Sequence, residues 1–215
     1  MSRDHFIIVP AMVATASALV AACDAKPGSS PSPDAPPPAV TVPATAAATA
    51  GFERTLELQG ITFRVSSTND RSLNQLRIVP AGLSIDNTPI AREVEGTVTG
   101  AQVADLDRNG SPEVYVYVQS AGSGSYGSLV AYAANNRKSL SEIYLPPVTD
   151  NPAVSKGYMG HDNFAVTKDA LVRRFPVYRE HDSNAQPTGG TRQLRYKLTP
   201  GEAGWVLQLD PTVND

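Results

Sequence analysis

A two-residue alternation of apolar and polar side chains constrains the fold of this chain more than any other feature. It begins after Gly51, and Ile61–Val65 and Val114–Val118 are two clear examples. Successive side chains of a β-strand point to opposite faces of the sheet, so this period predicts strands with one buried and one polar face. Gly, Pro, Asn and Asp interrupt the alternating runs, and no long stretch keeps a helical period. The pattern therefore predicts antiparallel strands packed as two sheets or as an open barrel.

The alternating runs amount to about eight or nine candidate strands, and the expected fold class is all-β, an antiparallel β-sandwich of about eight strands. Two of the runs contain a turn and are predicted as hairpins, one around Lys168–Ala170 and one around Pro200–Gly204. The predicted strand regions are Thr55–Leu58, Ile61–Ser66, Leu76–Val79, Arg92–Leu106, Glu113–Gln119, Leu129–Ala133, Ser141–Leu145, Phe164–Tyr178 and Arg192–Leu209. We expect residues 51–215 to form one domain that buries an adequate core without disulfides. The edges of its sheets could pair two copies as a homodimer.

The N-terminal segment has the layout of an export signal. Arg3 and His5 precede an apolar run from Phe6 to Ala22, which is short for a spanning helix and ends in small residues. Leu19–Cys23 resembles the lipobox of bacterial lipoproteins, in which the cysteine is acylated after cleavage. We therefore expect residues 1–22 to be a signal peptide and a lipid on Cys23 to attach the protein to a membrane in the periplasm. The alternative is ordinary secretory cleavage that leaves a free thiol, and which membrane holds the lipid stays open.

Residues 23–50 have the composition of a linker. Seven prolines between residues 24 and 50 stand among Ala, Ser and Thr, with almost no large apolar side chain. Such a segment cannot bury enough surface to offset its ordering entropy, so we expect a disordered tether that favours polyproline II. The net charge of the chain is −3 and 18% of its residues are charged. This balance provides no basic face for nucleic acid.

Asp105–Gly110 looks like the first half of a calcium-binding loop. Asp105, Asp107 and Asn109 stand at positions 1, 3 and 5 and are followed by Gly110, as at the start of an EF-hand. The twelfth position, where an EF-hand has a bidentate Glu, is Val116. The alternative, which we favour, is a turn between two strands in which the side chains bond their own backbone. No cofactor is predicted.

His161 and His181 are the only histidines after the signal segment, and each precedes an aspartate. They lie twenty residues apart, a spacing that fits no short metal-binding motif. We expect them to occupy the surface or turns.

The composition of Ser120–Ser128 differs from that of an ordinary hairpin loop. Three glycines and four serines surround Tyr126, and no charged residue occurs from Gln119 to Asn136. Solvated loops usually carry charge, whereas small donors, a permissive backbone and one ring are typical of a loop that enters a partner's cleft. A flexible loop with no partner is the alternative that composition alone leaves open.

The same loop does not match two common catalytic motifs. A nucleophile elbow requires Gly two residues before and after the serine, but Ala121 and Ser125 stand around Ser123. A glycine-rich phosphate cradle requires a helix N-terminus behind it, and here a strand is predicted to follow. Without a recognisable nucleophile and base, we expect a protein that is not an enzyme.

Five blocks of the sequence resemble the periplasmic inhibitors of I-type (invertebrate-type) lysozyme. The resemblance covers most of residues 52–210 and is strongest from Val103 onward. The most specific motif is Ser-Gly-Ser-Tyr at residues 123–126, because related lysozyme inhibitors share a similar loop. The blocks are Ser120–Pro147, Lys156–Asp162, Leu171–Pro176, Asp182–Ala185 and Pro187–Arg192.

The resemblance implies a β-sandwich whose loop inserts into the active-site cleft of an I-type lysozyme and thereby protects peptidoglycan. It assigns the contacts to Ser123 and Tyr126. The expected inhibitory loop comprises Ser120, Gly122, Ser123, Gly124, Ser125, Tyr126 and Gly127. Candidate flanking contacts are Tyr158, His161 and Arg173, for which turns and surface ion pairs are the alternative. The competing hypothesis for the whole domain is a calcium-dependent carbohydrate-binding or adhesion module built on Asp105–Gly110.

Overall fold

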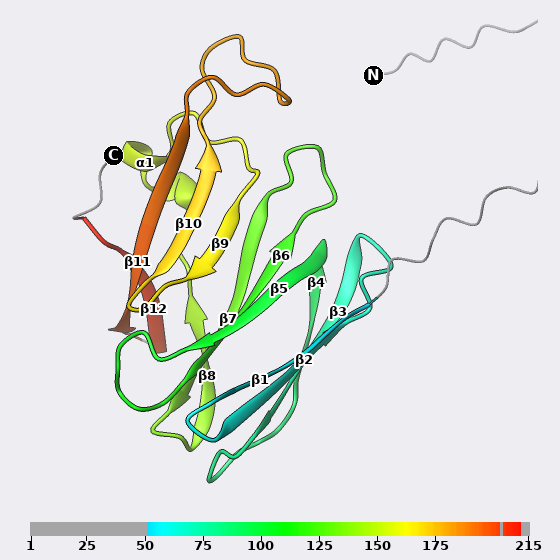
Figure 1. Cartoon of the computed structure of the whole chain (residues 1–215), viewed down its shortest axis with the longest axis vertical. Helices are drawn as coiled ribbons and strands as arrows, with labels where there is room; N and C mark the ends of the chain where they lie inside the picture. The colour runs from blue at the N-terminus through cyan, green and yellow to red at the C-terminus, as the bar shows by residue number, and fades with distance from the viewer. Residues whose placement is uncertain (1–50, 203, 212–215) are drawn as a thin grey trace, which may run out of the picture. The chain divides into compact units, whose positions relative to one another are not determined.

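The computed structural model describes residues 51–202 and 204–211, which form an all-β fold (Figure 1). The predicted signal peptide, Cys23 and the tether lie outside the described residues. The described strands are β1 (Phe52–Leu58), β2 (Ile61–Ser67), β3 (Leu73–Ala81), β4 (Ile90–Glu95), β5 (Thr97–Ala104), β6 (Glu113–Gln119), β7 (Gly127–Asn135), β8 (Ser139–Tyr144), β9 (Asn163–Val166), β10 (Leu171–Pro176), β11 (Thr191–Gly201) and β12 (Gly204–Leu209).

The strands form two sheets, as the alternation predicts. The smaller sheet has the order β1-β2-β3-β4, and the larger has the order β5-β6-β7-β8-β12-β11-β10-β9. Neighbouring strands are antiparallel except β8 and β12, which pair in parallel over two residues of each strand. The predicted hairpins are present as β9–β10 and β11–β12.

Two apolar cores hold the fold together. In the first, Ile61, Phe63 and other side chains of the smaller sheet pack with residues of β5, β6 and β7. The second lies on the other face of β6 and β7 and includes residues of β10, β11 and β12.

Strand β6 passes between the two cores and is buried on both faces. Val114, Val116 and Val118 pack in the first core, while Tyr115 and Tyr117 pack in the second. The alternating residues of β6 therefore face two different buried environments. Tyrosine can occupy the second one because its ring can be buried where its hydroxyl finds a hydrogen-bond partner. The expectation of one polar face is wrong for this strand.

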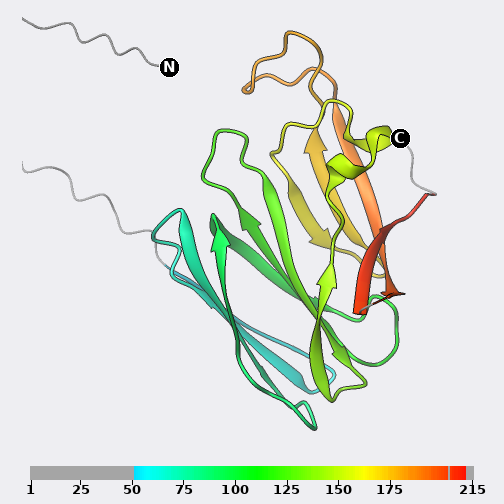
Figure 2. The same cartoon turned by 180° about the vertical axis from the view of Figure 1, so that it is seen from behind.

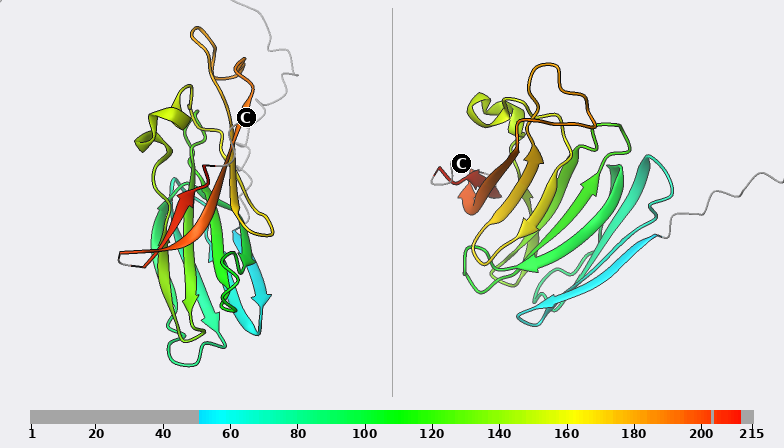
Figure 3. Two further views of the ribbon diagram at one scale, coloured as in Figure 1. Left: turned by 90° about the vertical axis from the view of Figure 1, so that its left-hand side faces the viewer. Right: turned by 45° about the horizontal axis from the view of Figure 1, so that its top comes forward.

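The larger sheet curls until its two edge strands approach each other (Figure 3). Val166 of β9 donates its backbone N–H to Oε1 of Gln102 on β5, with 3.0 Å between N and O. A side chain thus bridges the two edges where backbone pairing ends. The curl gives the second core its enclosed shape, close to that of a barrel.

The predicted number of about eight strands is too low, because the described residues contain twelve. The predicted run Arg92–Leu106 is two strands, β4 and β5, that belong to different sheets. The chain changes sheet at Gly96, which has a φ of 110° and lies so close to Gln119 that a Cβ would overlap its carbonyl group. Alternation continues on both sides of this glycine, so the period alone does not reveal the break.

Helical structure in the described residues is limited to a 3₁₀ turn, η1 (Val148–Asp150), and one short helix, α1 (Pro152–Ser155). Within residues 51–202 and 204–211, no helix has the length and apolar character needed to cross a membrane.

Strand β6 carries one loop at each end (Figures 1 and 2). Residues 105–112 connect it to β5 and are called the acidic turn below. Residues 120–126 connect it to β7 and are called the tip loop. A strand of seven residues places the two loops roughly 20 Å apart.

Candidate functional site

The tip loop is closed by hydrogen bonds of its own. Ser120 donates its N–H to the carbonyl oxygen of Tyr126 at 2.9 Å, and its hydroxyl accepts the N–H of Tyr126 at 2.9 Å. Within the loop, Ser125 donates its N–H to the carbonyl oxygen of Gly122 at 2.9 Å. Ser120 therefore has a structural role at the base of the loop.

Two segments far away in the sequence hold the loop from outside. The backbone N–H of His161 lies 2.8 Å from the carbonyl oxygen of Gly124, and Nδ2 of Asn184 lies 2.6 Å from that of Ser123. His161 Nε2 and Asn184 Oδ1 are 3.2 Å apart and link the two supports. Figures 1 and 2 show the segment after β10, which includes Asn184, at the same end of the molecule as the tip loop.

A buried ion pair lies beneath the loop. The side chains of Asp162 and Arg173 are 0% and 6% exposed, and Arg173 Nε lies 2.7 Å from Asp162 Oδ1. The other oxygen of Asp162 accepts the N–H of Gly127 at 2.8 Å and the hydroxyl of Tyr158 at 2.7 Å. A buried charge is stable only when it is paired and hydrogen-bonded, and here both conditions are met.

Aromatic rings surround the guanidinium of this pair. Its central carbon lies 5.1 Å from the ring centre of Tyr158 and 5.2 Å from that of Phe164, distances suited to cation–π contact. Tyr158 also accepts a hydrogen bond from Arg173 Nη2 at 2.7 Å. Burial raises the pKa of Tyr158, so its hydroxyl stays neutral and can donate to Asp162.

Two glycines allow the close packing of loop and support. A Cβ on Gly160 would overlap the carbonyl oxygen of Gly124, and a Cβ on Gly124 would overlap the ring of Tyr126. Gly160 also has a φ of 92°, which other residues rarely adopt. Gly124 and Gly160 therefore allow the loop and its support to pack in direct contact.

The outward face of the tip loop is polar but uncharged. The side chain of Ser123 is exposed, and Tyr126 is 48% exposed although its ring meets the edge of Tyr158 at 5.7 Å between centres. Among the described residues, the hydroxyl of Ser123 has no hydrogen-bond partner. A partner would thus meet a hydroxyl and a tyrosine ring that the base of the loop holds in place.

A groove of about 1000 Å³ begins beside Tyr126. It runs along the side of the larger sheet where β8 and β12 pair over only two residues each. Tyr144 and Trp205 line it farther along, so an apolar and aromatic surface adjoins the loop.

The structure brings the predicted flanking residues to the loop but gives them different positions. Tyr158 and His161 support the loop directly. His161 lies in the irregular segment before β9 with a φ of 58°, and His181 lies in a turn with a φ of 72°. Arg173 is buried, so it positions other groups instead of presenting its side chain to a partner. Sequence reasoning missed the roles of Asp162 and Asn184, because neither lies near the tip loop in the sequence.

The acidic turn has the geometry expected of an Asp/Asn-Gly turn. The N–H of Asn109 lies 2.9 Å from Asp105 Oδ1, and that of Gly110 lies 3.0 Å from Asp105 Oδ2. Oδ1 of Asn109 accepts the N–H of Ser111 at 2.7 Å, so Asn109 shapes the turn. The sequence motif did not include Glu113, which lies fully buried beside Asp105 and Asp107.

Comparison of the chain with known protein families, curated proteins and solved structures finds no match.

Proposed function

We propose that this protein is a stoichiometric inhibitor of I-type lysozyme and that its tip loop enters the active-site cleft of the enzyme. The observation that carries the proposal is an exposed, uncharged Ser-Gly-Ser-Tyr tip held from below by Asp162, His161 and Asn184. A loop already fixed in its bound shape loses little conformational entropy on binding, so more of its contact energy appears as affinity.

The chemistry of a lysozyme cleft suits such a tip. Two carboxyl groups flank the bond that the enzyme cleaves. Acidic side chains would be repelled there, and a buried unpaired cation would be costly, whereas a neutral hydroxyl can donate without either penalty. A hydrogen bond from Ser123 to a charged carboxylate would contribute roughly 1.5–3 kcal/mol.

Tyr126 provides the apolar part of the contact. About half of its surface is exposed, and Tyr158 holds its ring at an edge-to-face angle of 74°. Tyrosines that combine apolar area with a polar tip are common at the centre of tight interfaces. In this proposal the ring of Tyr126 fills a sugar-binding subsite next to the carboxyl groups.

Competition with a substrate analogue tests this placement. We expect an oligosaccharide of N-acetylglucosamine that occupies the cleft of an I-type lysozyme to compete with the inhibitor for binding. Ser123→Ala should weaken binding about tenfold or more, as loss of one charge-assisted hydrogen bond predicts. Ser84→Ala, which changes an exposed serine in the connection between β3 and β4, is the matched control and should bind as wild type does. Independent binding of oligosaccharide and inhibitor would contradict insertion into the cleft.

The proposal includes attachment to a membrane through a lipid on Cys23, in the periplasm. The lipobox-like Leu19–Cys23 supports it, as does the proline-rich composition that follows. Labelling of wild type by radioactive palmitate in a bacterial host, with no labelling of Cys23→Ser, is the expected result. Equal labelling of both would contradict it.

A further inference from the structure

Three carboxyl groups converge where the acidic turn meets β6. One oxygen each of Asp105, Asp107 and Glu113 lies within 4.8 Å of the other two. No salt bridge of the described residues compensates any of the three. The cluster therefore brings three acidic groups together without a basic partner.

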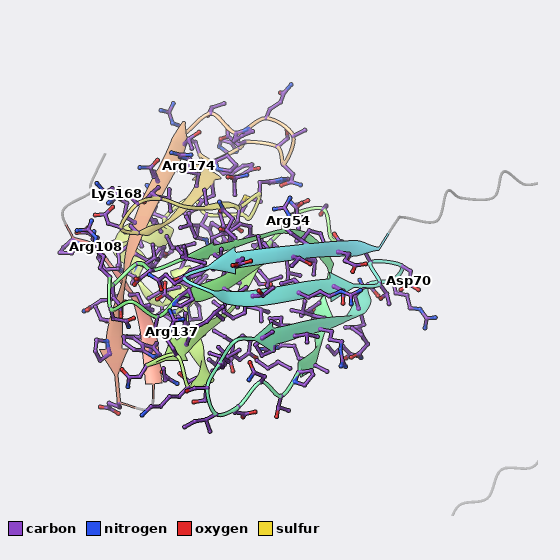
Figure 4. All side chains as sticks on the ribbon, turned by 60° about the horizontal axis from the view of Figure 1, so that its bottom comes forward. Arg54, Asp70, Arg108, Arg137, Lys168 and Arg174 are labelled. Atoms are coloured by element: carbon purple, nitrogen blue, oxygen red, sulfur yellow. The ribbon has the colours of Figure 1, made fainter. Side chains whose placement is uncertain are left out.

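Arg108, the basic residue of the turn, does not neutralise this cluster. It is exposed and lies at the outer edge of the molecule (Figure 4). The turn itself is at the surface, so an ion from solvent can reach the carboxyl groups.

Glu113 is fully buried, yet only one of its two oxygens is hydrogen-bonded. Oε2 accepts the N–H of Leu106 at 2.9 Å and the hydroxyl of Tyr115 at 3.3 Å. Oε1 is buried and has no hydrogen-bond partner among the described residues. Buried polar atoms without a partner are rare in folded proteins, and a bound cation is one way to satisfy such an oxygen.

We propose that Asp105, Asp107 and Glu113 bind a calcium ion. A divalent cation would supply the partner that Oε1 lacks and would neutralise three carboxylates together. Hard carboxylate oxygens favour Ca²⁺ over transition metals, and the irregular loop suits the flexible coordination of Ca²⁺ better than the strict octahedron of Mg²⁺.

The ligand set differs from the one that the sequence spacing indicates. Asn109 uses its carbonyl oxygen for Ser111, and Val116 at the twelfth position packs in the first core. Glu113, at the ninth position, takes their place from the start of β6. A strand that follows the turn can therefore provide the third carboxylate that a helix provides in an EF-hand.

Binding there would connect the two sheets. Oδ2 of Asp105 accepts a hydrogen bond from Gln59 Nε2 at 2.7 Å, and Gln59 lies in the turn between β1 and β2. The ion would thus fix a contact between the smaller sheet and the start of β6. We expect it to stabilise the fold, independently of the inhibitory function.

Calcium binding and thermal unfolding of the purified protein test the proposal. Equilibrium dialysis with radioactive calcium should find one ion per chain, and millimolar CaCl₂ should raise the melting temperature by several degrees relative to EDTA. MgCl₂ at the same millimolar concentration should give a clearly smaller shift of the melting temperature. No calcium uptake, or equal shifts with both salts, would overturn the site.

Variants separate a specific site from general attraction to negative charge. Glu113→Gln keeps the shape of the side chain but cannot form the carboxylate that would bind the ion, and it should lose the calcium-dependent shift. Asp150→Asn removes the same charge from an exposed turn and should keep the full shift. If Glu113→Gln does not fold, Asp107→Asn, which alters a partly exposed ligand, should lose the shift in its place. A ligand variant that retains the wild-type shift would contradict the proposal.

Discussion

A buried carboxyl group lies near each end of β6, but the two groups have different surroundings. Beneath the tip loop, Asp162 has a guanidinium on one oxygen and two hydrogen-bond donors on the other. Beside the acidic turn, Glu113 has donors on one oxygen only and two further carboxyl groups nearby. The comparison distinguishes a polar cluster that the protein completes by itself from one that requires an additional cation.

This difference also separates the proposed functions of the two loops. A completed cluster fixes the backbone above it, which is what a loop that enters a cleft needs. An incomplete cluster can respond to its surroundings, because its stability depends on a ligand.

Removal of Arg173 should have the largest effect on stability, because it leaves the carboxyl group of Asp162 without its cation. Arg173→Met leaves the charge of Asp162 buried and unpaired, so the free energy of unfolding should fall by about 3–5 kcal/mol. Urea denaturation measures this change. Arg174→Met alters the neighbouring, exposed arginine (Figure 4) and should change stability by less than about 0.5 kcal/mol. Similar losses of unfolding free energy in both variants would contradict a stabilising role for the buried Asp162–Arg173 pair.

Truncation of Tyr126 should affect binding more than stability. Half of its surface is exposed, so Tyr126→Ala should keep the fold yet lose about 2 kcal/mol or more of binding to I-type lysozyme, roughly thirtyfold. Inhibition assays and melting curves measure the two effects. Tyr144→Ala, an exposed tyrosine farther along the groove, is the control for a general loss of aromatic surface. Wild-type inhibition by Tyr126→Ala would show that the tip is not the contact.

Loss of Asn184 should loosen the tip loop without unfolding the domain. Asn184→Ala removes the hydrogen bond to the carbonyl oxygen of Ser123, so the loop should lose about 1 kcal/mol of local stability. Hydrogen exchange of the Ser125 and Tyr126 amides should accelerate severalfold. Ser183→Ala, one residue away and exposed, should leave the exchange unchanged. Unchanged exchange in Asn184→Ala would indicate that the loop is rigid without this support.

Glu113→Gln should have the smallest effect, provided that calcium is absent and the pH is low. Burial, reinforced by Asp107 and Asp105, raises the pKa of Glu113 to about 8. A raised carboxyl pKa stabilises the folded state below the unfolded value near 4.5, and this contribution is lost as the pH rises through about 8. In EDTA the wild type should therefore lose stability between pH 5 and pH 8 relative to Glu113→Gln. Urea denaturation at several pH values measures the difference, and a pH-independent difference would contradict a protonated Glu113.

The sequence predicted the all-β fold well because its buried strands alternate as a sandwich requires. Ile61, Phe63 and Val65 are buried as the period indicates, and Glu113–Gln119 is a strand with the predicted bounds. The period failed at Gly96 because a change of sheet preserves the alternation. It also could not show that the tyrosines of β6 face a second core.

Residues of the candidate sites could be predicted from the sequence only where a short motif or the family resemblance marks them, as it does for Tyr158 and His161. Ser123, Tyr126, Asp105 and Asp107 could be identified from short motifs. The supporting roles of Asn184 and Asp162 could not be predicted, since Asn184 reaches the tip loop across 61 residues and the Asp162–Gly127 contact spans 35. The importance of Glu113 depends on its burial, which no local pattern reveals.

Titration of lysozyme activity with the purified, folded protein tests the central claim most directly. The account predicts that an I-type lysozyme loses activity in proportion to added protein until about one equivalent is present. Parallel titrations of c-type and g-type lysozymes measure the selectivity. Full activity of every lysozyme type at an excess of the folded protein would contradict the proposal that the tip loop is an inhibitor.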